Sequence, residues 1–132
     1  MTPQPPTPAA PLRLSALGHT WLIDLDGVVC PHNGHLRGDE TLLPGVREFW
    51  ATIPVGDCVV LLSARGVEHQ AAALALLAAA GLRVDHALFG LPFGERILIN
   101  DAKPSGLLTA LAVNVVRDAG LEGIALEVSP DL

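Results

Sequence analysis

Short apolar runs that end in Gly or in acidic residues divide this chain into regular segments. One run begins at Trp21 and leads into Asp24, Asp26 and Gly27. An apolar run of this length bounded by Gly is typical of a buried strand. The run 58–62 is apolar at every position, which predicts a central parallel strand that is buried on both faces.

Two later runs predict further strands, and one stretch is ambiguous. Residues 85–90 form a short apolar run that ends in Gly, and residues 96–101 form another that ends in acid. Both runs are expected to be strands. Residues 107–111 favour a turn of helix and the β-branched stretch 112–116 favours a strand, although the helix could instead continue through this stretch.

Two segments between these runs have the spacing of helices. Residues 43–54 carry apolar side chains at helical intervals, with Pro44 in the first turn and Pro54 at the end. Residues 67–80 are mostly Ala and Leu, which are strong helix formers, and they stop at Gly81. Their almost continuous apolar surface predicts deep packing against a sheet.

The order of these elements predicts the fold class. Strand, helix, strand, helix, strand, strand is typical of an α/β fold with one Rossmann-like, doubly wound parallel sheet and helices on both faces. The length of 132 residues fits one domain. Residues 2–12 hold five of the eleven prolines and no charge. We therefore expect a disordered tail over residues 1–15 and a folded domain over residues 16–132.

Composition narrows the classes of partner. The formal net charge of −6 and the pI near 5.1 argue against nucleic-acid binding, which needs a basic face. Mean hydropathy is +0.44, yet no charge-free apolar run approaches the length of a membrane span. Cys30 and Cys58 are the two cysteines, and no secretory signal is recognisable. We therefore expect a soluble protein of the reducing cytoplasm, without a membrane partner, and oligomerisation stays open.

The two carboxylates after the first run are the strongest candidate for chemistry. Strand geometry directs Asp24 and Asp26 to the same side while Leu25 turns away. Two like charges this close repel, and a hard cation such as Mg²⁺, often together with substrate phosphate, relieves the repulsion. The pair thus predicts a phosphate-handling magnesium site. The alternative is that the two residues end the strand and begin an Asp-Gly turn.

Ser63 follows the run 58–62 directly. Open α/β sheets place their ligands at the carboxyl ends of strands, so the Ser63 hydroxyl is a candidate for binding a phosphate oxygen. A helix N-cap is the alternative role, because Ser is equally suited to that position.

The polar segment 30–40 is expected to form a flap over the strand ends. In this flap, the side chains of His32, His35 and Arg37 are candidates for contact with substrate. Cys30 together with the two histidines is an alternative zinc site, because thiolate and imidazole are preferred zinc ligands. A fourth ligand is missing from the segment, which favours the flap.

The motifs, in this order, resemble those of the haloacid dehalogenase superfamily. Asp24-Leu25-Asp26-Gly27-Val28 looks like its first motif, Ser63 after four apolar residues looks like its second, and Asn100-Asp101 after Ile97-Leu98-Ile99 looks like its fourth. The similarity covers residues 20 to about 120. Stretches around these motifs further resemble small capless members that are associated with bacterial polysaccharide and sugar-nucleotide biosynthesis.

By position, the resemblance implies a mechanism and a role for each residue. Asp24 would be the nucleophile that forms an aspartyl-phosphate, and Asp26 the acid/base that protonates the leaving oxygen and then activates water. Mg²⁺ would be held by Asp24, by the backbone carbonyl of Asp26 and by Asp101, with Asn100 beside it. Residues at the strand ends would bind the phosphoryl group: Gly27, Ser63, Ala64 and Arg65.

Two departures from the family pattern bear on the site. Leu91 stands where members of this size often carry lysine, so the cation beside the phosphoryl group must come from elsewhere. Lys103 and Arg96 are the candidates, and Lys103 is favoured because Arg96 begins a predicted strand and would lie at its far end. Asn100 stands in place of an acid, which removes one charge from the metal site.

The expected function is that of a Mg²⁺-dependent phosphatase acting on a small phosphate ester, with a sugar phosphate as the leading candidate. Without room for a cap domain, selectivity would come from the flap, from a partner subunit or from a large substrate. A degenerate family member that binds a phosphorylated ligand or a protein partner without turnover is the alternative. Retention of both Asp24 and Asp26 favours the enzyme, and a scaffold that uses the Pro-rich tail is a third class.

Overall fold

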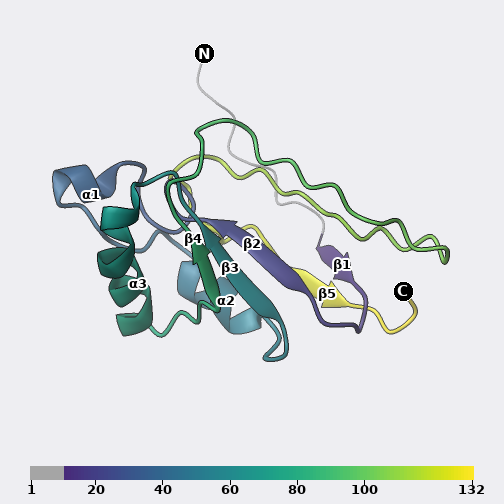
Figure 1. The fold of residues 1–132 in the computed structure, drawn as a ribbon. Helices are drawn as coiled ribbons and strands as arrows, with labels where there is room; N and C mark the ends of the chain where they lie inside the picture. Colours follow the sequence, from purple (N-terminus) through teal and green to yellow (C-terminus); the bar gives the residue numbers. More distant parts are fainter. Residues whose placement is uncertain (1–10) are drawn as a thin grey trace, which may run out of the picture.

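The computed structural model describes residues 11–132 as an α/β fold with two small parallel sheets (Figure 1). The elements follow one another as β1 (Leu12–Leu14), β2 (Thr20–Asp24), α1 (Gly34–Arg37), α2 (Val46–Thr52), β3 (Cys58–Leu62), the 3-10 helix η1 (Val67–His69), α3 (Gln70–Ala79), β4 (His86–Leu88) and β5 (Leu126–Val128). The α/β class is therefore confirmed. One doubly wound sheet is not found among the described residues. Residues 1–10 of the expected disordered tail lie outside the described residues. The last part of that predicted tail, residues 11–15, contains β1.

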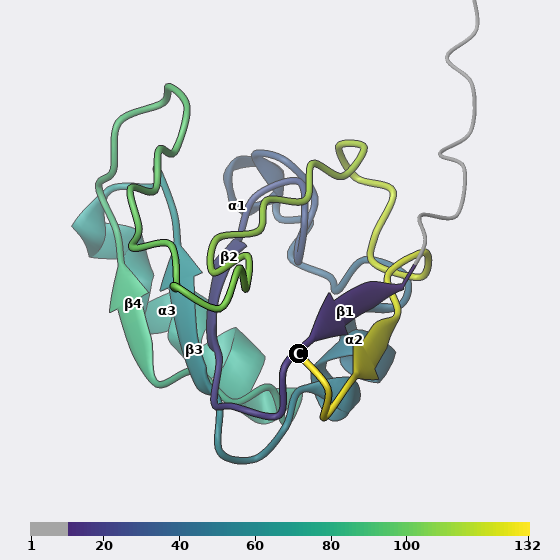
Figure 2. The same cartoon turned by 90° about the vertical axis from the view of Figure 1, so that its right-hand side faces the viewer.

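The larger sheet has the order β2-β3-β4, with all three strands parallel (Figure 2). β3 lies in the centre and pairs along its whole length with β2, from Thr20 opposite Cys58 to Asp24 opposite Leu62. The central position predicted for the run 58–62 is thus confirmed. Because parallel strands end at the same edge of a sheet, the residues that follow β2 and β3 meet there.

The core lies between this sheet and the helices α2 and α3. Its most deeply buried apolar side chains are Leu25, Val29, Val46, Val59, Leu61 and Leu77. α2 begins at Val46 and buries its apolar stripe as predicted, although Pro44 lies before the helix and not in its first turn.

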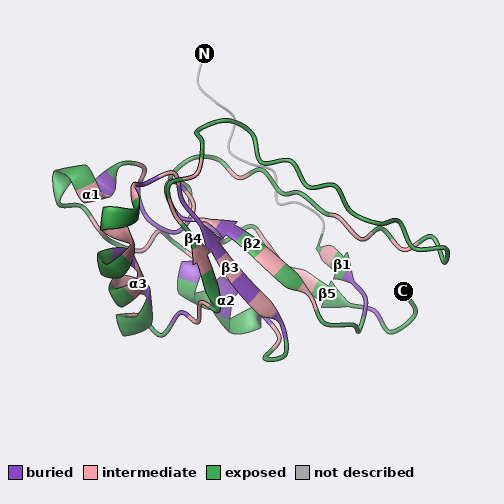
Figure 3. Ribbon diagram, viewed as in Figure 1, coloured by how far each residue is buried: buried purple, intermediate pink, exposed green. Residues whose placement is uncertain are grey.

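The predicted helix over residues 67–80 is present as η1 and α3, but it does not pack deeply. Ala73 and Leu77 are its buried residues, and much of the remaining surface of α3 is exposed (Figure 3). One face of a three-stranded sheet is too narrow to cover a helix that is apolar all round. Within residues 11–132, no helix has the length and hydropathy that a membrane crossing requires.

A second sheet joins the two ends of the described chain. β1 and β5 pair in parallel, with Leu12 opposite Leu126 and Leu14 opposite Val128. The sequence did not predict either strand. Each has three residues, which is too short for the alternation of apolar and polar positions to stand out.

Residues 92–117, here called the arm, leave the sheet as two extended stretches (Figure 1). The predicted strand at 96–101 and the predicted elements at 107–116 are wrong, because the arm contains neither helix nor strand. The Asn100 side chain donates to the Thr109 carbonyl at 3.1 Å, and a turn between Lys103 and Gly106 closes the tip. Ile97 and Ile99 are 84% and 92% exposed. An apolar run favours burial, but it becomes a strand only where a partner offers backbone hydrogen bonds.

Asp57 organises the opposite end of the sheet. Its carboxylate accepts hydrogen bonds from the His19 backbone N–H at 3.1 Å, from Trp21 Nε1 at 2.9 Å and from His19 Nδ1 at 2.7 Å. Burial alone would raise the pKa of Asp57, but the hydrogen bonds from Trp21 and His19 outweigh it, so the pKa lies below its ordinary value of 3.8. The network fixes the start of β2 against the turn that precedes β3.

We expect Asp57→Asn to lower the free energy of unfolding at pH 7 by about 2–4 kcal/mol, because buried donors lose a charged acceptor. A group whose folded pKa is depressed contributes stability above its unfolded pKa of 3.8, and that contribution is lost as the pH falls through the folded pKa. The difference between wild type and variant in urea unfolding should therefore shrink below about pH 4. Asp131→Asn, at an exposed site, is the control, and a constant difference down to pH 2.5 would contradict the network's role.

Candidate active site

A tight turn directly after β2 presents the two candidate carboxylates. The Leu25 carbonyl accepts hydrogen bonds from the N–H groups of Val29 at 2.9 Å and Cys30 at 3.1 Å. Gly27 lies inside the turn with φ of 80°, a left-handed conformation that favours glycine, and its N–H donates to the Cys30 carbonyl at 2.7 Å. Asp26 therefore stands outside the strand, on a turn, whereas Asp24 is the last residue of β2.

Asp24 is the more open of the two carboxylates. Its side chain is 37% exposed, and its Oδ1 lies 3.4 Å from Nη1 of Arg96. Burial raises the pKa of Asp24, the Arg96 guanidinium opposes this effect, and the nearby Asp26 carboxylate adds to it. The net pKa is above the ordinary value, so an additional cation at this position would stabilise the ionised form.

Asp26 is held by three groups from other parts of the chain. Arg65 Nε donates to both of its carboxylate oxygens, at 3.0 and 3.2 Å, and the Ser63 hydroxyl donates to Oδ2 at 3.3 Å. His35 Nδ1 lies 4.0 Å from Oδ1. The Asp26 side chain is 15% exposed, so its orientation is set by protein groups and not by solvent.

Ser63 and Arg65 lie at the end of β3, where the sequence places them, but both are buried. Ser63 is fully buried, and its Oγ also accepts a hydrogen bond from the Arg65 backbone N–H at 3.0 Å. Both side chains contact the protein's own Asp26. The alternative role of Ser63 as a helix N-cap is wrong, because η1 has Gly66 at that position. Ala64 between them is half-buried, and Gly27 is buried.

The flap, residues 30–40, folds around the one-turn helix α1. The His32 backbone N–H donates to Asp118 Oδ1 at 2.8 Å, and Arg37, which is exposed, donates to the His32 carbonyl at 3.0 Å. His35 packs edge-on against His69, with ring centroids 4.8 Å apart. Burial lowers the pKa of His35, the Arg65 guanidinium lowers it further, and the carboxylates around it oppose these effects only in part. His35 is thus uncharged at neutral pH.

The alternative zinc site does not assemble in the flap. Cys30 is fully buried in the core, and burial raises the pKa of its thiol to about 11. Across residues 11–132, no group of three His, Cys, Asp or Glu side chains is arranged to hold a metal ion.

Asp24 and Asp26 nevertheless fit a Mg²⁺ ion in part. They supply hard oxygen donors, and Mg²⁺ in proteins is typically held by one or two carboxylates together with water and phosphate oxygens. Around them, three carboxylates face two guanidinium groups, those of Arg65 and Arg96, which leaves an excess of negative charge for a cation to balance. Glu40 is the third of these carboxylates.

The remaining predicted residues lie on the arm. Asn100 and Asp101 are exposed, and in the described chain their hydrogen bonds join them to Thr109 and not to the carboxylates. Lys103 is exposed as well and forms no ion pair among the described residues. The expectation that Arg96 lies far from Asp24 is wrong, because without a strand at 96–101 the arm brings its guanidinium to Asp24.

Sequence reasoning missed two residues at this site. Glu40 pairs with Arg65, with 2.7 Å between Oε1 and Nη1, and nothing in its sequence context distinguishes it from a solvated acid. Asp118 donates its N–H to the Gly27 carbonyl at 2.9 Å and accepts from His32 with its side chain. Its left-handed φ of 63° is uncommon for a residue other than glycine, and Asp tolerates it better than most.

The comparisons with known proteins identify neither a family nor a function for this chain. Neither protein-family models, nor curated proteins, nor solved structures give a match to the chain. The functional argument therefore depends on the residues and their geometry.

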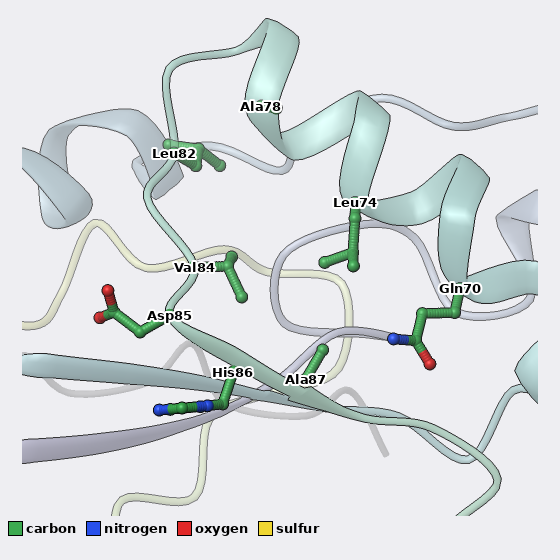
Figure 4. A pocket seen from close by; sticks show the side chains of 8 residues that line it. All are labelled: Gln70, Leu74, Ala78, Leu82, Val84, Asp85, His86 and Ala87. Atoms are coloured by element: carbon green, nitrogen blue, oxygen red, sulfur yellow. The ribbon is translucent and has the colours of Figure 1, made fainter.

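A cavity of about 400 Å³ lies between α3 and β4. It is lined by Gln70 and Leu74 on the helix side and by Asp85 and His86 on the strand side (Figure 4). None of the predicted site residues lines this cavity.

The environment of Cys30 can be tested by thiol labelling, without an assay of enzymatic activity. At pH 8 a thiol with a pKa of about 11 is ionised to roughly one part in a thousand, and here the sulfur is also buried. In Cys58→Ser protein, iodoacetamide at pH 8 should therefore leave Cys30 unmodified in the native state and label it fully in guanidinium. Cys30→Ser, which retains the half-buried Cys58, is the matched control and should be labelled faster. Equal labelling of Cys30 in the native and unfolded protein would show that its environment is misassigned.

Proposed function

We propose that this protein is a Mg²⁺-dependent phosphohydrolase that cleaves small phosphate esters through an aspartyl-phosphate at Asp24. The observation that carries the proposal is the unequal environment of two neighbouring carboxylates at one strand end. The Asp24 side chain is partly exposed and faces the partly exposed guanidinium of Arg96. Asp26 is enclosed and is held by Arg65 and Ser63. Two carboxylates in different environments are suited to different roles in one reaction.

In the proposed reaction, Asp24 is the nucleophile because its carboxylate is the accessible one. Its oxygen forms a bond to phosphorus as the bond to the leaving alcohol oxygen breaks, and Asp26, which enters this step in its protonated form, donates its proton to that oxygen. In the second step Asp26 accepts a proton from water, whose oxygen attacks phosphorus. The bond to Asp24 then breaks, inorganic phosphate leaves, and both carboxylates return to their initial states.

The Asp24 carboxylate and the Asp26 backbone carbonyl are the groups that would hold Mg²⁺. When bound, this ion neutralises charge on the phosphoryl oxygens and the carboxylate, which otherwise repel each other. The excess negative charge of the cluster supports this part of the proposal.

We further propose that the arm closes on the site and completes a doubly wound sheet. β2 forms one edge of its sheet, and no described strand pairs with its outer side. Ile97 and Ile99 lie exposed on the arm, and burying each would contribute about 1.5–3 kcal/mol. Pairing of residues 96–101 with the open edge of β2 would withdraw Arg96 from Asp24. The same movement would bring Asp101, with Asn100, to the metal and Lys103 to the phosphoryl group.

The resemblance to the haloacid dehalogenase superfamily and the flap support a substrate class. The small flap leaves Asp24 partly exposed, which suits a small phosphate ester such as a sugar phosphate. His32, His35 and Arg37 lie on the flap that borders the site and would contribute to substrate choice. The two cysteines form no disulfide, which agrees with a reducing cytoplasm as the proposed compartment.

One observation favours a second candidate, binding of a phosphorylated ligand without turnover. Both carboxylates already have an arginine partner, so a site that stays in this state would attract a ligand to its cations but would not offer a free nucleophile. Measurement of turnover decides between the two functions.

The nucleophile is tested by Asp24→Asn with p-nitrophenyl phosphate as substrate. Wild-type protein should release nitrophenolate in the presence of Mg²⁺ and lose the activity in EDTA. Asp24→Asn should lower turnover by more than a thousandfold, because an amide is a poor nucleophile and a weaker metal ligand. Asp131→Asn is the control, and full activity of Asp24→Asn would contradict the mechanism.

Arm closure is tested by comparing the two candidate cations. If the arm closes, Lys103→Ala should lower turnover by about a hundredfold, the scale for one preorganised transition-state contact, and Arg96→Ala should have little effect. Asp101→Ala should raise the Mg²⁺ concentration that gives half-maximal activity. Loss of activity in Arg96→Ala beside normal activity in Lys103→Ala would show instead that Arg96 is the working cation and that the arm stays open.

A further inference from the structure

A buried ion-pair cluster links the flap to Asp26. Arg65 Nε bonds both oxygens of Asp26, and on its other side Arg65 Nη1 lies 2.7 Å from Oε1 of Glu40. The three groups come from the turn after β2, the loop after β3 and the flap. The Arg65 side chain is 2% exposed, so these two carboxylates and not solvent balance its charge in the intact protein.

The backbone of Arg65 is fixed independently of both carboxylates. Its N–H donates to Ser63 Oγ at 3.0 Å, and its carbonyl accepts from the Gly90 N–H at 2.7 Å. The direction of the guanidinium therefore depends on its side-chain partners. Nη2 is buried and has no hydrogen-bond partner among the described residues, so the two carboxylates balance the charge of a group that is otherwise poorly satisfied.

We propose that Glu40 is a positioning residue: it holds the Arg65 guanidinium from the flap side, and Arg65 in turn keeps Asp26 oriented for proton transfer to the leaving oxygen. This inference rests on the proposed function of the site. Without Glu40, the Arg65 guanidinium keeps Asp26 as its remaining carboxylate partner and turns toward it. The carboxylate is then drawn away from the position in which its proton reaches the leaving group.

The contact between Glu40 and Arg65 depends on charge. Oε1 of Glu40 is buried and lies within ion-pair distance of Nη1, but the contact lacks hydrogen-bond geometry. Substitution by Gln keeps the shape and removes the charge, whereas substitution by Asp keeps the charge at a greater distance. The neighbouring Asp39 offers a matched control, because it is exposed and pairs with Arg37 on the surface at 3.7 Å.

The experiment compares a phosphate ester with a good leaving group, p-nitrophenyl phosphate, and one with a poor leaving group, glycerol phosphate. A poor leaving group needs the proton from Asp26, and a good one departs without it. Glu40→Ala and Glu40→Gln should lower kcat/KM for glycerol phosphate at least about tenfold more than for p-nitrophenyl phosphate, because kcat/KM reports the first step, in which the leaving group departs. Glu40→Asp should recover part of the difference, and Asp39→Ala should resemble wild type.

The ratio of the two kcat/KM values, measured on one sample, does not depend on the folded fraction. A role in stability alone would lower both kcat/KM values equally, so an unchanged ratio in Glu40→Ala and Glu40→Gln would overturn the inference. The same change of ratio in Asp39→Ala would overturn it too. If wild-type protein with Mg²⁺ hydrolyses neither ester, the proposed function itself fails, and this inference fails with it.

Discussion

The parallel ladder between β2 and β3 is the constraint on which the site depends. Its register sets Asp24 opposite Leu62, and the ladder continues as the Leu25 N–H donates to the Leu62 carbonyl at 2.9 Å. This alignment brings Ser63 and Arg65 level with Asp26. A slip of one residue would turn every side chain of one strand to the opposite face, so that the hydroxyl and the guanidinium would no longer reach the carboxylate.

The sequence allowed the prediction of features that depend on local pattern. The run 58–62 is apolar throughout, and only a central strand buries both of its faces, so its place in the sheet followed from composition alone. The contact between Asp26 and Ser63 agrees with the common direction of parallel strands. The first prediction used the hydrophobic pattern of one strand, and the second used the common direction of two neighbouring strands.

Other features depend on contacts between distant segments, which no local pattern records. Arg65 was expected to bind a phosphoryl group, but its side chain is buried between Asp26 and Glu40. The run 96–101 has the composition of a strand, yet composition states only that these residues favour burial and does not name the edge that would receive them. The polar partners of a buried group are likewise set by the tertiary fold, as Glu40 shows.

The charges at the strand ends give the two carboxylates different properties even though two residues separate them. Arg65 is buried with Asp26, where a weak dielectric response strengthens their attraction, whereas Arg96 meets Asp24 at a half-exposed position that solvent screens. A cation that enters the site would therefore displace Arg96 from Asp24 more readily than it would displace Arg65 from Asp26, and a phosphate would reach Arg96 more readily than Arg65. The difference in burial thus favours exchange at the Asp24–Arg96 pair before exchange at the Asp26–Arg65 pair.

Both ends of the arm are hydrogen-bonded to residues of the candidate site. At its start the Leu91 N–H donates to the Ser63 carbonyl at 3.1 Å, and just past its end the Asp118 N–H donates to the Gly27 carbonyl at 2.9 Å. A segment tethered in this way presents its side chains to the anchor points at an effective concentration on the order of millimolar, whatever the concentration of the protein. Because the entropy of closing a loop rises only with the logarithm of its length, insertions at the tip of the arm would dilute Asp101 and Lys103 very little. Insertions at the tip would accordingly be compatible with the proposed closure of the arm.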